Sequence, residues 1–315
     1  MAAPVGSASH APRYVLMTAA YNEAANIEKT IATVLGQTIL PQRWVVVSDN
    51  STDGTDEIVK KYAVQYDFLR FLRVNRPPGH SFRSKVVALQ QAAGLFDGAA
   101  YEFIGNLDAD ITLEPTYFEE LMRKFERDRA LGIVSGFVHE QKTGEFRTRK
   151  SNRTVSVPHA AQLVRRECYE SIGGYAVLKY GGEDWYAQTC ARMNGWDAES
   201  IPSLPIFHHK PTGTGANLLG HRYRLGKLDY SFGSHPLFEA VKCLRHMSDS
   251  PVVLGGILRM LGFLSCYMLR EPRAVPASLW LFFAKNRWGA LFPWLAQLQP
   301  APPRSKSFPS YFTNT

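Results

Sequence analysis

Cysteine is scarce in this chain of 315 residues, and its four cysteines form no CxxC pair. This spacing excludes a zinc finger and a small disulfide framework, so the default expectation is a reduced, cytosolic site. The first residues also lack the apolar stretch of a secretory signal peptide, and we expect residues 1–12 to form a loose tail. Internal repeats and long low-complexity stretches are absent from the sequence.

Acidic residues are fewer than basic residues, 28 against 36, which gives a formal net charge of +8. Such a surplus favours anionic partners, among them nucleotides, lipid phosphates and anionic membranes. The chain carries no nucleic-acid-binding motif, and three acidic groups stand where predicted elements meet loops, which argues against a groove for a phosphate backbone. Hydrophobic residues make up 45% of the chain, enough for a packed core.

The first half of the chain alternates short apolar runs with helical patterns. This alternation predicts an α/β fold with a mostly parallel sheet between flanking helices. The strands are expected at residues 14–17, 44–47, 71–74, 103–107 and 132–138. Asn22 is expected to cap the first helix, and the polar, basic segment 142–157 shows no clear period.

Two carboxylates, Asp108 and Asp110, directly follow the expected strand 103–107. In an open α/β sheet, ligands bind beyond the carboxyl ends of the strands. Oxygen ligands suit a hard cation such as Mg²⁺ or Mn²⁺, and such a cation can neutralise the charge on a leaving nucleoside diphosphate. The alternative is an ordinary solvated loop, because short acidic pairs are frequent.

Asp49 ends the expected strand 44–47 and could accept a hydrogen bond from a base or a ribose. The alternative is an Asx turn or a helix cap, a role that Asp53 and Ser51 also fit. His208 and His209 follow an apolar stretch. Neighbouring residues on a strand point to opposite faces, so at most one of the two histidines faces the site, and the sequence does not decide which.

Glu183 and Asp184 follow two glycines and open a helix expected over residues 185–194. The N-terminus of a helix stabilises a carboxylate anion, and a poised carboxylate can take the proton from an attacking hydroxyl. The alternative is a pair of ordinary first-turn acids.

Four motifs, in this order, resemble the pattern of glycosyltransferase family 2: Thr18–Glu23, Ser48–Thr55, Asp108–Asp110 and Gly181–Asp184. The resemblance covers roughly residues 13–209. It implies a GT-A type fold, a nucleotide-binding α/β/α sandwich with a mostly parallel sheet, and a catalytic domain at residues 13–215.

The resemblance also implies roles for individual residues. One set would bind the nucleotide-sugar: Thr18, Tyr21, Glu23, Asp49, Arg76, Lys85, Asp108 and Ala109. Within it, Asp49 matches the aspartate that recognises the base, usually uracil. Asp108 and Asp110, with His208, would hold the divalent metal. Asp184 matches the catalytic base, with Glu183 beside it, and members of this kind usually invert the anomeric centre.

The chain departs from the family pattern at two points. Ser48 stands where the second motif usually begins with an acid, which weakens any role of that acid. The Gln-x-x-Arg-Trp motif of polymerising members is absent, which favours an enzyme that adds a single sugar.

Residues 216–299 form a basic and apolar region, and residues 300–315 a polar tail. The apolar stretch 251–269 is near the minimum length for a membrane span, but Arg259 at its middle would cost about 2.5–3.5 kcal/mol there. A second stretch, 278–295, carries three tryptophans and two basic residues. We expect helices attached to a membrane, either in its plane or as a re-entrant segment. Two buried helices that cover the catalytic domain or form a dimer contact, or a two-span hairpin, are the alternatives.

Together these features predict a metal-dependent transfer of a sugar from a nucleotide-sugar, with uridine as the expected base, to a glycan or lipid-linked acceptor. The basic segment 210–245 would guide a phosphate-bearing acceptor, and the expected location is the cytoplasmic, inner face of the cell membrane. Two alternatives remain: an inactive scaffold or anionic-membrane binding module, and a sugar-phosphate nucleotidyltransferase. The latter would need a glycine-rich first loop, where this chain has Ala19–Glu23.

Overall fold

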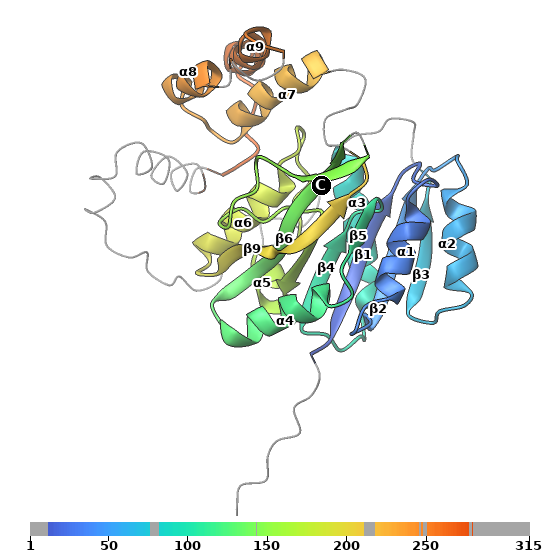
Figure 1. Ribbon diagram of the computed structural model, residues 1–315. Helices are drawn as coiled ribbons and strands as arrows, with labels where there is room; N and C mark the ends of the chain where they lie inside the picture. Colours follow the sequence, from blue (N-terminus) through green and yellow to red (C-terminus); the bar gives the residue numbers. More distant parts are fainter. Residues whose placement is uncertain are drawn as a thin grey trace, which may run out of the picture.

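The computed structural model describes residues 12–75, 82–142, 144–210, 218–245, 247, 251–276 and 279. Within these residues, helices cover both faces of one nine-stranded sheet, and three further helices lie to one side of these layers (Figure 1). The expected tails, residues 1–12 and 300–315, lie outside the described residues apart from Pro12.

Nine strands and nine α-helices are defined in the described parts of the chain. The strands are β1 (Tyr14–Ala20), β2 (Arg43–Asp49), β3 (Leu69–Val74), β4 (Phe103–Leu107), β5 (Ile111–Leu113), β6 (Leu131–Lys142), β7 (Glu145–Thr148), β8 (Ala161–Arg165) and β9 (Asp197–His208). The helices are α1 (Ile27–Leu35), α2 (Thr55–Ala63), α3 (Phe82–Ala93), α4 (Tyr117–Arg127), α5 (Arg166–Ser171), α6 (Glu183–Met193), α7 (Leu218–Ser231), α8 (Pro236–Arg245) and α9 (Leu254–Met268).

The strand order is β3-β2-β1-β4-β8-β6-β9-β5, with β7 paired to β6. Strands β3, β2, β1 and β4 pair in parallel, as expected from the alternation of apolar runs with helical patterns. Beyond β4 the sheet contains antiparallel pairs, including β4 with β8 and β5 with β9. The parallel half therefore presents the carboxyl ends of β1, β2 and β4 at one edge.

Two apolar cores lie on the two faces of the sheet. One contains Ile31 of α1, Val59 of α2 and Leu121 of α4, and the other contains Leu89 of α3 and Ala187 of α6. The α/β/α sandwich expected from the sequence is therefore confirmed.

Two local expectations are corrected. Segment 142–157, in which the absence of a clear period predicted no strand or helix, contains the strand β7, which pairs antiparallel to β6. Asn22 does not cap α1, since the helix begins after Asn26. The Asn22 side chain instead accepts a hydrogen bond from the backbone N–H of Thr52 at 2.9 Å.

The first C-terminal apolar stretch forms α9, which packs on α7 and α8. Arg259, at the middle of α9, is buried, and its guanidinium donates to Asp229 of α7 and to Glu239 of α8. Among the described residues, none of the helices has the length and apolar character needed to cross a bilayer. The second apolar stretch, 278–295, lies outside the described residues except for Leu279.

Candidate functional site

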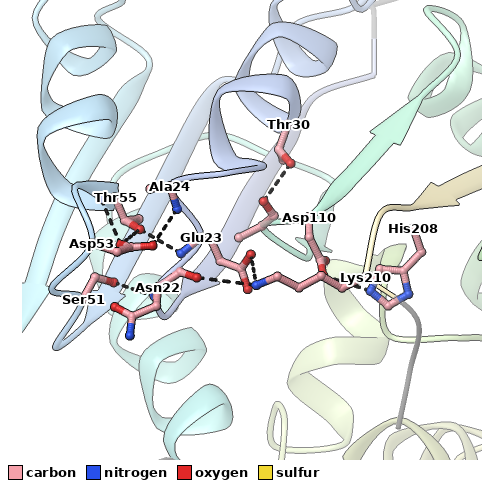
Figure 2. A network of polar contacts seen from close by, with 11 residues as sticks. Asn22, Glu23, Ala24, Thr30, Ser51, Asp53, Thr55, Asp110, His208 and Lys210 are labelled. Atoms are coloured by element: carbon pink, nitrogen blue, oxygen red, sulfur yellow. Dashed lines mark hydrogen bonds and ion pairs between the residues drawn. The ribbon is translucent and has the colours of Figure 1, made fainter. Parts of the chain in front are cut away.

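The loops after β1 and β2 are joined to each other by hydrogen bonds, shown in Figure 2. Three backbone N–H groups of the first loop donate to side chains of the second: Asn22 to Ser51 Oγ at 3.1 Å, Glu23 to Thr55 Oγ1 at 2.8 Å, and Ala24 to Asp53 Oδ2 at 3.0 Å. Asp53 Oδ1 also accepts from the N–H of Thr55 at 3.2 Å. Ser51 and Asp53 thus fix the loops, as the turn interpretation of these residues predicted.

A cavity of about 480 Å³ opens beside these loops, at the carboxyl ends of β1, β2 and β4. Its lining comes from five separate parts of the chain: Ala19, Ala20, Tyr21, Asn22, Glu23, Asp49, Lys85, Asp108, Ala109, Asp110, His208 and Lys210. Eight of the residues that the sequence proposed for the donor or the metal therefore meet in one place: Tyr21, Glu23, Asp49, Lys85, Asp108, Ala109, Asp110 and His208.

One proposed residue that the structure describes does not join this cavity. Thr18 is fully buried, and its Oγ1 accepts a hydrogen bond from Trp44 Nε1 at 3.0 Å. Strand β1 runs to Ala20, so Thr18 still lies inside the strand with its side chain in the core. The prediction that Thr18 lines the nucleotide pocket is corrected accordingly. Arg76 lies outside the described residues.

Lys85 of α3 reaches the cavity from the other face of the sheet. Its Nζ lies 2.6 Å from Asp108 Oδ1. Burial disfavours the charged ammonium, but Asp108 and the neighbouring acids outweigh burial and raise the pKa of Lys85. The lysine is therefore a fixed positive charge in the wall of the cavity.

Asn106 contacts Asp108 on one side and His159 on the other. Asn106 Nδ2 donates to Asp108 Oδ1 at 3.3 Å and also contacts the carbonyl oxygen of His159. Burial, together with the charge of Lys85, holds the pKa of His159 well below its usual range. His159 is thus a neutral, buried residue next to Asn106.

Asp110 pairs with His208. His208 Nε2 lies 3.1 Å from Asp110 Oδ2, whereas His209 Nε2 lies 3.0 Å from Thr112 Oγ1 and turns away from the cavity. Burial lowers the pKa of His208, but the hydrogen bond and charge of Asp110 raise it by more. Of the two histidines, His208 is the one that lines the cavity.

The donor set at this position fits a hard divalent cation in part. Asp108, Asp110 and His208 supply carboxylate oxygens and an imidazole nitrogen at the cavity wall, which are ligands suited to Mn²⁺ or Mg²⁺. Within the part of the chain that the structure describes, no group of three or more His, Cys, Asp or Glu side chains is close enough to enclose a metal by itself. Such an ion would take its remaining ligands from a phosphate or from water.

Glu183 and Asp184 form the first turn of α6, as expected, but they do not line the cavity. Burial raises the pKa of both carboxyl groups, and the charge of Lys85 opposes the rise in each case. Gly181 and Gly182 adopt φ angles of 89° and 87°, which side chains rarely tolerate. The glycine pair thus allows the tight turn that brings the two acids close to Lys85.

Lys210 is a cavity residue that sequence reasoning assigned only to a basic segment. Its Nζ lies 2.5 Å from Glu23 Oε2. Burial raises the pKa of Glu23, and Lys210 opposes the rise. The position of Lys210, two residues beyond His208, was the available signal, because a residue just past the end of β9 must lie near the same edge.

The sequence of the chain is similar to that of a known protein family and of several known proteins. The model for the family described as "Glycosyl transferase family 2" matches residues 16–181, more than half of the chain. Poly-beta-1,6-N-acetyl-D-glucosamine synthase of Staphylococcus epidermidis is 29% identical over 122 residues, which are 38% of this chain and 27% of that protein. The same synthase of Staphylococcus aureus strain COL is 29% identical over 120 residues. The chain thus spans about a quarter of the length of these relatives.

Solved structures share the fold. The mannosyltransferase PcManGT from Pyrobaculum calidifontis, in complex with GDP-Man and Mn²⁺, superposes with a TM-score of 0.53 at 20% identity, over 92% of this chain and 83% of that one. S. aureus TarS superposes with a TM-score of 0.50 at 16% identity, over 76% of this chain and 44% of that one. The expected family is confirmed by the match of its model over residues 16–181: this chain belongs to glycosyl transferase family 2.

Proposed function

We propose that this enzyme transfers a sugar from a nucleotide-sugar to a hydroxyl group of a glycan or of a lipid-linked acceptor. The observation that carries the proposal is the cavity itself, which gathers Asp49, Lys85, Asp108 and Asp110 from four separate elements at the carboxyl edge of the sheet. Each group matches a part of the donor: the base, the diphosphate and the cation that accompanies it.

In this proposal Asp49 accepts a hydrogen bond from the base, and Tyr21, 39% exposed at the cavity wall, packs against it. Lys85 pairs with the diphosphate. Asp110 and His208, with Asp108, would hold Mn²⁺ or Mg²⁺, which supplies neutralisation of the charge that develops on the leaving diphosphate. The Mn²⁺ in the structure of PcManGT, a protein of the same fold, supports this choice of cation.

Asp184 acts as the general base in the proposed reaction. The acceptor oxygen attacks the anomeric carbon as the bond from that carbon to the diphosphate oxygen breaks, and the acceptor proton passes to Asp184. A single displacement of this kind inverts the anomeric centre. Burial raises the pKa of Asp184, which makes its carboxylate a stronger proton acceptor near neutral pH. Glu183 beside it adds negative charge to the same turn.

The donor and acceptor are proposed more narrowly as follows. We infer a uridine nucleotide from the family resemblance of Asp49, and a single addition from the absence of a Gln-x-x-Arg-Trp motif. The polymer synthases named above match this chain over only 27% of their length. We therefore take from them only the class of acceptor, a surface glycan. The proposed place of action is the inner face of the cell membrane.

A thermal-shift experiment tests the proposal. The full chain is heated with UDP, GDP or TDP, with and without Mn²⁺. A ligand at about a hundred times its dissociation constant adds about 2.7 kcal/mol to stability, which is readily measured. We expect a metal-dependent shift with UDP that Asp49→Asn and Asp110→Asn abolish and that Asp67→Asn, at an exposed position outside the cavity, leaves unchanged.

The other outcomes are equally informative. A shift with GDP or TDP alone would support the proposed transfer reaction but would replace uridine as the donor nucleotide. A protein that shifts with none of the nucleotides would refute the transferase and favour an inactive scaffold.

A further inference from the structure

Helix α9 has an inverted distribution of polarity. Its exposed positions are all large and apolar: Leu254, Ile257, Leu261, Leu264, Tyr267 and Met268. Its buried positions are mostly small or charged: Gly255, Gly256, Arg259, Gly262, Phe263 and Cys266. A helix on the surface of a water-soluble domain has the opposite pattern, with its apolar stripe facing the core.

The surface of α9 that packs on α7 and α8 is polar, and the helix backbones approach each other closely. Arg259 is bonded to Glu239 Oε1 at 3.0 Å and to Asp229, and Lys242 lies 2.6 Å from Asp229 Oδ1. A Cβ on Gly262 would stand 1.9 Å from the carbonyl oxygen of Tyr223. Glycine contacts and internal ion pairs are what join helices whose outer surface faces lipid.

The neighbouring helix α8 extends the apolar surface. Leu237, Val241 and Leu244, spaced at helical intervals, are 66%, 53% and 65% exposed. We use the term apolar face for these three residues together with the exposed residues of α9 given above. A soluble monomer rarely leaves so many large apolar side chains exposed on two neighbouring helices.

Positive charge borders the apolar face. Arg245 ends α8 and Arg270 follows α9, and both are exposed. The acidic residues of the described segments 218–245 and 251–276 are each engaged by basic side chains: Asp229 and Glu239 by Arg259, and Glu271 by Lys179. The surface that remains is apolar and basic, which complements an anionic lipid surface.

We propose that the apolar face docks on an anionic lipid bilayer, with α9 lying in the plane of the membrane. With 15 residues, α9 is about 22 Å long, shorter than the hydrocarbon core of about 30 Å. An apolar helix face buried at the boundary between headgroups and acyl chains, bordered by arginines, is the arrangement of an interfacial helix. In Figure 1, α8 and α9 are the helices farthest from the sheet, as such docking requires.

Residues of α7 and of the segment after α9 contact the loop that precedes α6. Arg224 of α7 donates to the carbonyl oxygen of Tyr180 at 2.5 Å, and Tyr180 Oη donates to Glu271 at 2.6 Å. These contacts fix the segment that leads into Asp184. If the proposed function holds, on which this consequence rests, docking would bring the acceptor side of the site towards a lipid-borne acceptor.

Vesicle flotation of the full chain tests the docking, using equal parts of phosphatidylcholine and phosphatidylglycerol and no nucleotide. We expect binding that weakens with added salt or with phosphatidylcholine alone. Leu244→Glu with Leu261→Glu should lower the partition constant at least about tenfold. The matched control replaces Val64 and Val155, which are 88% and 70% exposed outside α7–α9, with glutamate and should bind as the original chain does.

Two results would overturn the docking. In the first, the chain does not bind the vesicles and forms a dimer that the Leu244→Glu, Leu261→Glu double variant dissociates. The apolar face would then be a contact between two copies of the chain. A chain that stays monomeric and does not bind the vesicles would refute the docking as well. Because the assay contains no donor, its failure is distinct from the absence of a nucleotide shift, which concerns the cavity.

Discussion

Replacing Arg259 with methionine tests how α7, α8 and α9 are held together. The buried guanidinium of Arg259 lies between Asp229 and Glu239, and Lys242 contacts Asp229 at 2.6 Å. The cluster therefore contains two positive and two negative charges. Methionine has a comparable volume but no charge, so Arg259→Met leaves a net negative charge in the buried cluster.

The expected cost follows from the burial of the partners. Removing one member of a buried ion pair costs about 3–5 kcal/mol, because the remaining charge has lost its counter-charge. Burial and the charge of Asp229 already raise the pKa of Glu239, and Arg259 opposes that rise. Without Arg259 the pKa of Glu239 rises further, and the folded protein binds a proton that the unfolded chain releases.

This proton gives the variant a pH signature. Between the lower unfolded pKa and the raised folded pKa of Glu239, the folded state binds more protons than the unfolded state. The free energy of unfolding should therefore fall by up to about 1.4 kcal/mol for each pH unit as pH rises. The destabilisation caused by Arg259→Met should be smaller at mildly acidic pH than at mildly alkaline pH.

Hydrogen exchange of the α7–α9 amides at both pH values measures this effect directly. The second variant, Arg259→Met with Glu239→Gln, retains the neutral pair of Asp229 and Lys242, and should recover protection and lose the additional pH slope. Arg245→Met, at an exposed position, is the control. Equal protection in Arg259→Met and the unchanged chain would refute the argument that this cluster joins the helices.

Three further predictions concern the site. Asp184→Asn should lower kcat by about 10²–10⁴-fold without changing the Kd for UDP. In the unchanged enzyme, kcat should rise with pH through the raised pKa of Asp184. A variant with an unaltered kcat would exclude Asp184 as the general base. Lys85→Met should weaken binding of UDP in calorimetry but not that of uridine, and equal losses would contradict a diphosphate contact. Thr18→Val should lower the free energy of unfolding by about 1–3 kcal/mol, because buried Trp44 Nε1 loses its acceptor, with nucleotide affinity retained; lost affinity would reinstate Thr18 as a pocket residue.

The strand ends were the most predictable part of the site. Apolar runs that end in Asp49 and Asp108 predict buried strands with carboxylates at one edge, and the parallel pairing of β1 with β2 and β4 brings these ends together. Thr18 could not be placed in the same way. Its neighbours in the motif reach the cavity, and only the full length of β1 shows that position 18 is inside a strand.

The role of Arg259 was beyond the reach of sequence reasoning for a different reason. Its partners Glu239 and Asp229 are 20 and 30 residues away on separate helices, so no local pattern connects them. A basic residue in the middle of an apolar run was interpreted as a cost of membrane insertion, whereas the fold turns it inward, away from the apolar face. Only tertiary packing distinguishes these two possibilities.

The contacts between the C-terminal helices and the catalytic layers converge on one side of the site. Arg224 and Glu271 bind Tyr180, and a Cβ on Gly182 would stand 2.8 Å from the ring of Phe232, which follows α7. All of these contacts touch the segment that enters α6, and none of the cavity lining near Asp49 belongs to α7, α8 or α9. A disturbance of these helices should therefore reach the proposed base before it reaches the donor pocket, so lipid docking would act on the KM for the acceptor and on kcat, while the Kd of the nucleotide remains unchanged.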